Sequence, residues 1–270
     1  MIENALLLQH PSNFYDVNLK DRLQSNNSND IVLNKNFNKW SEHISNHIQY
    51  RDQSQCGKYY SQNIASELLG ACINHKNMYK NNNSIETCDT AIMLTHPLYL
   101  NLSHMHKLTT DSLKQESDTY LDKLFDLMSI DRLNKFSIVL LDTIHHYAAA
   151  TSLLLEKKYV DDVIFTEYKN GFALDMDDIN PNKEKIIYFA GSYNGRCLRN
   201  SIDEFKKIVN DLPLNLPVPV CDDSIYAIKD LVLKYPEKNI DTLIPDSIDG
   251  LALDKVVSLE HMLKSIGVAR

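Results

Sequence analysis

Cys197 is the residue in this sequence that is best placed to act as a nucleophile. It follows residues 191–196 (GSYNGR), whose two glycines and asparagine tolerate positive φ angles, so that the turn can point N–H groups inward and hold an anion. Cys197 is expected in the first turn of a helix, directly after Arg196. Because a helix N-terminus and a neighbouring cation both stabilise a thiolate, this position predicts a lowered pKa and a reactive sulfur. The alternative is a packing role, since cysteine is among the most frequently buried residues.

The partners that such a nucleophile needs follow another apolar run. His145 or His146 is expected to serve as the base that removes the thiol proton, and Asp142 is expected to orient it. Polar residues near this turn and after a later run supply the substrate contacts, and we expect them to be Tyr193, Asn194, Gly195, Arg196 and Asp222. The first hypothesis is therefore a small-molecule hydrolase or transferase with a cysteine nucleophile, acting on a polar, anionic substrate.

Residues 186–224 resemble the nucleophile loop of the isochorismatase-like cysteine hydrolases, in which a strand, a glycine, a short loop and a cysteine lead into a helix. The resemblance implies a nucleophilic role for Cys197. That family also uses an aspartate at the end of its first strand and a lysine before a later strand. Here the first apolar run ends in Thr95 and His96, and Asp142 is too close to Cys197 in sequence to be that aspartate. The chain is therefore not assigned to the family.

Histidines form a second group of candidate functional residues. Five of the ten fall between His96 and His146, and His96, His104 and His106 follow the first apolar run. Imidazoles combined with a carboxylate suit zinc, iron or manganese, and three protein ligands with one open position make a catalytic site. The second hypothesis is a metal-dependent hydrolase in which these three histidines bind a divalent metal. The alternative is that each histidine is hydrogen-bonded within a loop. No HExxH or DxHxD motif occurs.

Short apolar runs that alternate with helical periods predict the fold that positions these residues. The runs at 91–94, 136–141, 163–165, 186–190 and 216–220 indicate strands, and the spacing predicts helices over 113–128, 147–158, 198–209 and 224–234. Strands that are buried on both faces and joined through helices form parallel sheets. We therefore expect an α/β fold over residues 89–270: a mostly parallel sheet with flanking helices, as in a Rossmann-like three-layer sandwich. Ligands of such sheets bind at the carboxyl ends of the strands, where most of the residues named above lie.

Two features qualify this architecture. Pro217 and Pro219 interrupt the last run, which is therefore expected at an edge of the sheet. Residues 1–88 are rich in asparagine, and apolar residues recur four apart at Trp40, Ile44 and Ile48. This segment is predicted to be a helical extension of the α/β domain.

Composition excludes several classes of protein. A net charge of −8 without basic clusters argues against a nucleic-acid binder. The five cysteines form no C-x-x-C pair, and neither a signal peptide nor a membrane-spanning apolar run is present, so a cytoplasmic location is expected. GxGxxG and GxxxxGK[ST] motifs are absent, which disfavours NAD and ATP. A third hypothesis is a non-catalytic bacterial effector, exported without a signal peptide, or a ligand-binding module.

Overall fold

The computed structural model describes residues 88–132, 135–143, 154, 158–166, 186–211, 222–251 and 253–268. The strands are β1 (Thr90–Thr95), β2 (Ser137–Thr143), β3 (Asp162–Thr166), β4 (Ile186–Ser192), β5 (Ile225–Leu233) and β6 (Val256–Val257). The helices are α6 (Asp111–Met128), α8 (Cys197–Asp211) and α9 (Leu259–Ser265). Short helical turns are the π-helix η2 (Leu100–His104) and the 3₁₀ turns η3 (Met105–Lys107), η4 (Asp222–Ser224) and η5 (Asp249–Leu251).

The strands form one sheet in the order β3-β2-β1-β4-β5-β6, and every neighbouring pair is parallel. The predicted parallel sheet is therefore confirmed. From β1 the chain builds outward through β2 to β3, and it then returns to place β4 against the other side of β1. The strand order thus reverses between β1 and β4, and in open α/β sheets the crevice at such a switch point is where ligands bind.

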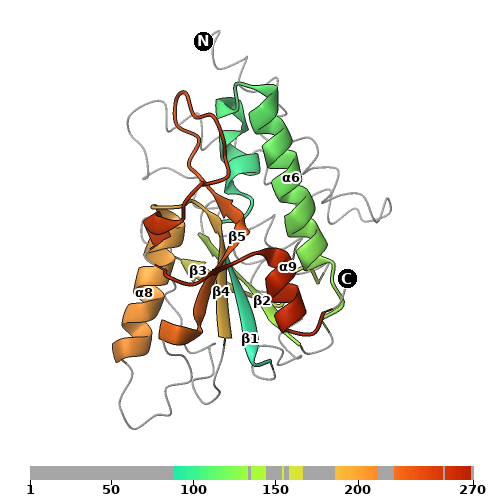
Figure 1. Ribbon diagram of the computed structural model, residues 1–270, viewed down its shortest axis with the longest axis vertical. Helices are drawn as coiled ribbons and strands as arrows, with labels where there is room; N and C mark the ends of the chain where they lie inside the picture. The colour runs from blue at the N-terminus through green and yellow to red at the C-terminus, as the bar shows by residue number, and fades with distance from the viewer. Residues whose placement is uncertain are drawn as a thin grey trace, which may run out of the picture.

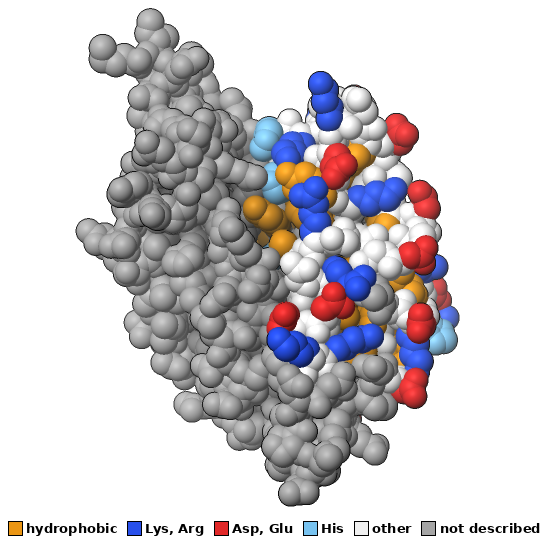
Figure 2. Space-filling view, turned by 90° about the vertical axis from the view of Figure 1, so that its left-hand side faces the viewer, with side chains coloured by type: hydrophobic (Ala, Val, Ile, Leu, Met, Phe, Trp, Pro, Cys, Tyr) orange, Lys and Arg blue, Asp and Glu red, His pale blue; other side chains and the backbone are white. Residues whose placement is uncertain are grey.

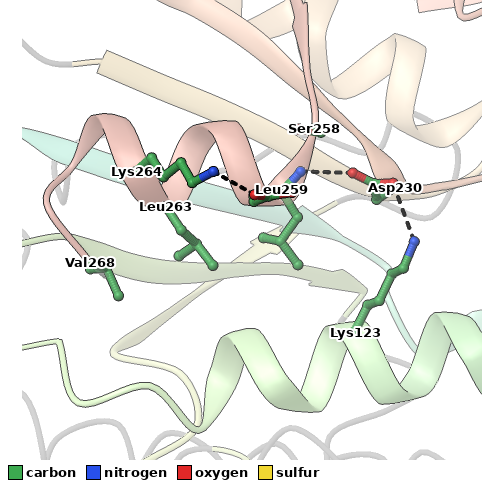
Figure 3. Close-up of a pocket in the computed structure, with 8 residues that line it drawn as sticks. Lys123, Asp230, Ser258, Leu259, Leu263, Lys264 and Val268 are labelled. Carbon is green, nitrogen blue, oxygen red and sulfur yellow. Dashed lines mark hydrogen bonds and ion pairs between the residues drawn. The ribbon is translucent and has the colours of Figure 1, made fainter. Parts of the chain in front are cut away.

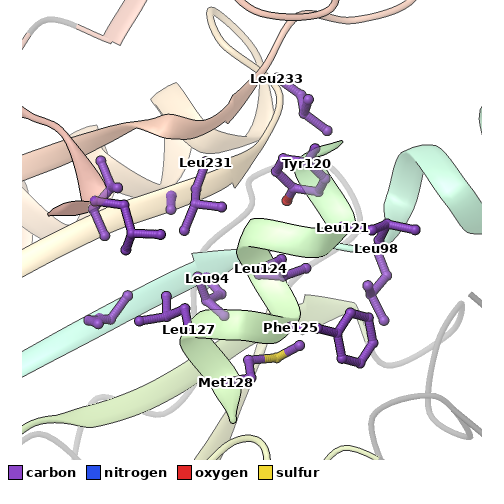
Figure 4. Packing of buried hydrophobic residues seen from close by; sticks show 14 of the residues in the cluster. Leu94, Leu98, Tyr120, Leu121, Leu124, Phe125, Leu127, Met128, Leu231 and Leu233 are labelled. Carbon is purple, nitrogen blue, oxygen red and sulfur yellow. The ribbon is translucent and has the colours of Figure 1, made fainter. Parts of the chain in front are cut away.

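The sheet is the middle layer of three. Figure 1 shows α8 on one face and α6 with α9 on the other, as expected for a three-layer sandwich. On the α8 face, Phe205 of α8 packs on Phe189 of β4 with ring centroids 5.5 Å apart. On the α6 face, Figure 4 shows Leu124 and Leu127 lying between their helix and the strands, near Leu94 and Leu231. Among the described residues, no helix is both long and apolar enough to cross a membrane.

Helix α6 illustrates how the sequence determines where a helix begins and which of its faces is buried. Thr110 caps its first turn by accepting a hydrogen bond from the Leu113 backbone N–H at 3.3 Å. Its buried side chains then recur three and four apart, as the predicted helix over 113–128 requires; they are Leu113, Ser117, Tyr120, Leu121, Leu124, Phe125, Leu127 and Met128. The predicted helix over 198–209 is likewise confirmed, as α8.

The helix predicted over 224–234 is wrong, because these residues form strand β5. A bulge explains the error. Phe189 pairs with Ala227, whereas Gly191 pairs with Val232, so β5 uses five residues where β4 uses two. The bulge brings Ile228 and Leu231 to the same core at a spacing of three, and this spacing imitates a helical period.

Several predictions fall outside the described residues. They are the extension over 1–87, almost the whole helix over 147–158 and the edge strand over 216–220. In the structure, β5 is the strand beside β4, and β6 forms one edge of the sheet.

Candidate functional site

The carboxyl ends of β1 and β4 meet at the switch point and carry most of the predicted site residues. Gly191 pairs with Thr95 and has a φ of 114°. A Cβ atom at Gly191 would lie 2.0 Å from the Thr95 carbonyl oxygen, so only glycine fits there. The side chains of Thr95 and Ser192 are fully buried, and within the described part of the chain neither hydroxyl has a hydrogen-bond partner. The ends of these two strands therefore hold two buried hydroxyls with unused bonding capacity.

Cys197 is the first residue of α8 and is partly buried, so its predicted position is confirmed. Burial raises the pKa of its thiol, and the stabilising effects of its own backbone N–H and of Arg196 are smaller. The predicted lowering of the pKa is therefore wrong. The Arg196 guanidinium is engaged elsewhere, 3.7 Å from the centre of the Tyr235 ring and 2.9 Å from a Glu237 carboxylate oxygen. The nucleophilic role of Cys197 stays a prediction.

The raised pKa has a measurable consequence for alkylation. Because only the thiolate reacts with iodoacetamide, Cys197 should label more slowly at pH 7 than the cysteine of a short unstructured peptide. Its rate should keep rising as the pH passes the ordinary cysteine pKa. Peptide-resolved mass spectrometry between about pH 6 and pH 10 measures both effects, a range that brackets the ordinary thiol value. Labelling faster than the reference peptide at pH 7 would instead show a stabilised thiolate.

Tyr193 and His104 form a buried pair that the sequence did not indicate. The Tyr193 hydroxyl and His104 Nδ1 lie 2.8 Å apart in a hydrogen bond whose donor depends on the imidazole tautomer. Burial, followed by the neighbouring Tyr99 and Tyr235, raises the pKa of Tyr193 well above its ordinary value, so its hydroxyl stays protonated. Five ring pairs among Tyr99, His104, Tyr193 and Tyr235 have centroids 4.6–5.8 Å apart. We call these four residues the aromatic cluster.

Two cations border the aromatic cluster on Tyr235. The Arg196 guanidinium lies over the ring, and the Lys107 ammonium lies 4.2 Å from its centre and hydrogen-bonds to its hydroxyl. Figure 2 shows Lys, Arg and histidine side chains around a hydrophobic patch near the upper edge of the face that it displays. Two cations thus lie beside the carboxyl ends of β4 and β5, and one of them, Arg196, is paired with the Glu237 carboxylate.

The loop after β4 is tied to its surroundings by backbone contacts. The Asn194 backbone N–H donates to the Leu233 carbonyl at 2.8 Å, and its side-chain amide donates to the Ser247 carbonyl at 3.2 Å. Gly195 has a φ of 69°, as the predicted turn requires. Asn194 and Gly195 therefore hold the shape of the loop, and their predicted contact with substrate is untested.

The three histidines of the metal hypothesis do not form a binding site by themselves. His104 is hydrogen-bonded to Tyr193. Its ring centroid lies 6.3 Å from that of His106, which is exposed. His96 is buried and has a φ of 43°. Its burial lowers the pKa of its imidazole to about 4. Within the described residues, no three His, Cys, Asp or Glu side chains are arranged to hold a metal ion.

The remaining predicted residues are placed less fully. Asp142 is the second-to-last residue of β2, so its backbone lies at the correct end of the sheet, but its side chain is not described. His145 and His146 lie outside the described residues. Asp222 opens η4, directly before β5. It therefore lies at the amino end of that strand, so the structure does not bring it to the switch point.

No protein-family model matches the chain, and no curated protein or solved structure is significantly similar to it. The site is therefore interpreted from its own residues.

Proposed function

We propose that the chain is a hydrolase or transferase that binds a small, polar, anionic substrate at the switch point between β1 and β4. The observation that supports the proposal best is the pair of buried hydroxyls of Thr95 and Ser192, which have no hydrogen-bond partner among the described residues. A buried polar group without a partner costs free energy. A ligand that accepts a hydrogen bond from either hydroxyl would remove part of that cost.

The charges around the site favour an anion. Arg196 directly precedes α8, and both its guanidinium and the Lys107 ammonium lie against the ring of Tyr235. A helix N-terminus and a cation both attract negative charge, although the charge of Arg196 is already paired with Glu237. The polar, anionic character of the substrate is proposed on this basis.

Cys197 is the candidate nucleophile in this proposal, and its raised pKa adds a requirement. The thiol proton must pass to a base as the sulfur bonds to the electrophilic centre of the substrate and the leaving group departs. Water or a second acceptor then displaces the sulfur. His145 and His146 remain the predicted bases.

Inorganic phosphate is a suitable first probe of anion binding. It should raise the melting temperature of the full chain in a saturable manner, beyond the effect of NaCl at the same ionic strength. Thr95→Val and Ser192→Ala should each weaken phosphate binding about five- to tenfold, the loss expected for one hydrogen bond. Neither should lower the free energy of unfolding without phosphate, because the hydroxyl that each removes has no partner among the described residues.

Ser137→Ala is the matched control. The Ser137 hydroxyl is also buried and also lacks a hydrogen-bond partner in the described part of the chain, but Ser137 begins β2 and so lies at the opposite end of the sheet. Its replacement should leave phosphate binding unchanged. A non-saturable phosphate effect, or an equal loss of affinity in all three variants, would contradict the proposal.

A further inference from the structure

The Arg196–Glu237 ion pair links the loops that follow β4 and β5. The Glu237 carboxylate lies 2.9 Å from the Arg196 guanidinium, and both side chains are exposed. Among the described residues, Glu237 is the one carboxylate that pairs with Arg196. An anion that approaches this guanidinium therefore meets Glu237 as a competitor.

Arg196 is held more firmly than Glu237. The Arg196 backbone N–H donates to the Tyr193 carbonyl at 3.0 Å, and its guanidinium lies 3.7 Å from the centre of the Tyr235 ring. The Glu237 carboxylate has no hydrogen bond within the described residues other than the one from Arg196. Because an exposed ion pair contributes little to stability, the carboxylate can leave at small cost while the guanidinium stays in place.

The charges beside Tyr235 favour an incoming anion over a cation. The Lys107 ammonium lies 4.2 Å from the centre of the same ring and pairs with no carboxylate in the described part of the chain, so two cations face one carboxylate. The cavity of about 420 Å³ between α6, β5 and α9 differs in this respect, because each of its two lysines is paired with a carboxylate (Figure 3). Equal numbers of opposite charges indicate no preferred ligand charge in that cavity, whereas the surplus cation beside Tyr235 does.

We propose that Glu237 is a built-in competitor of the substrate: its carboxylate occupies Arg196 in the free protein, and the anionic group of the substrate displaces it. This inference rests on the proposed function, because it takes the anion to bind beside the carboxyl end of β4. Binding then exchanges one ion pair for another, so the affinity for the anion is lower than the two cations alone would give. A residue on the loop after β5 thereby sets the affinity of the site.

Titration calorimetry of the full chain with inorganic phosphate at fixed ionic strength tests the competition. Glu237→Gln removes the charge but keeps an oxygen that can accept a hydrogen bond from Arg196. It should bind phosphate about two- to fivefold more tightly, the range that corresponds to loss of an exposed ion pair. Asp241→Asn is the matched control, because Asp241 is exposed on the same loop and pairs with no cation among the described residues. It removes the same charge and should leave the affinity unchanged.

Arg196→Gln separates competition at Arg196 from general repulsion. It should weaken phosphate binding, and in this background Glu237→Gln should have little further effect, because the carboxylate no longer has a guanidinium to occupy. An equal gain from Glu237→Gln with and without Arg196 would overturn the proposal, as would a gain no larger than that of Asp241→Asn.

The variants at the strand ends distinguish this inference from the proposed function. If phosphate binding is weakened by Thr95→Val or Ser192→Ala but is not strengthened by Glu237→Gln, the competition alone is wrong. If phosphate responds to Glu237→Gln and Arg196→Gln but to neither strand-end variant, the proposed site alone is wrong. Absence of phosphate binding in both the wild type and Glu237→Gln contradicts both.

Discussion

Gly191→Ala should destabilise the protein by at least about 4 kcal/mol, a large part of the stability of an ordinary domain. The new Cβ would lie 2.0 Å from the Thr95 carbonyl oxygen, which is backbone and cannot turn away as a side chain could. In addition, φ at Gly191 is 114°, a conformation that residues with a Cβ rarely adopt. The two central strands would have to separate at the switch point, so binding at that site should be lost as well.

Gly195→Ala separates the steric effect from the effect of φ. Gly195 also has a positive φ, of 69°, but a Cβ there would meet no atom within 4 Å. Gly195→Ala should lower the free energy of unfolding by only about 1–2 kcal/mol, the usual penalty for an L-residue in the left-handed region. Urea unfolding followed by circular dichroism measures both variants. A Gly191→Ala protein as stable as Gly195→Ala would show that β1 and β4 do not approach as closely as described, whereas failure of Gly191→Ala to fold agrees with the expected loss.

Strands β1, β2 and β4 could be predicted because both of their faces are buried, which leaves continuous apolar runs in the sequence. Strand β5 could not, since its bulge places Ile228 and Leu231 in one core at a helical spacing. This error also concealed Tyr235, which follows β5 and belongs to the aromatic cluster. With a helix predicted over 224–234, Tyr235 was not expected at the carboxyl end of a strand, where ligands of parallel sheets bind.

The place of the candidate site in the fold could be inferred, but its electrostatics could not. The carboxyl ends of β1 and β4 follow from chain order and parallel pairing alone. The pKa of Cys197 depends on how much protein surrounds the thiol, and burial there outweighs the helix N-terminus and Arg196. The Tyr193–His104 bond joins residues 89 positions apart, and no local pattern encodes it.

His96→Asn should remove part of the acid sensitivity of the protein. His96 is buried, and its pKa is lowered from 6.5 to about 4 by burial. Below pH 6.5 the unfolded chain binds a proton at His96 that the folded chain does not bind until the pH approaches 4. The free energy of unfolding therefore falls between these two values, by about 2 kcal/mol at pH 4.5 relative to pH 7. Asparagine carries no such proton, and it tolerates the φ of 43° at this position.

The measurement is the free energy of unfolding of both proteins at pH 7 and pH 4.5, obtained from urea denaturation. Loss of the packed imidazole lowers the stability of the variant at both pH values. Other titrating groups act in both proteins, so the difference between the two pH-dependent losses isolates His96. The wild type should lose about 2 kcal/mol more than His96→Asn, and His261→Asn, which replaces an exposed histidine of α9, should keep the wild-type loss. Equal losses in wild type and His96→Asn would show that the folded protein accepts the proton on His96, and hence that this imidazole is not enclosed at the end of β1.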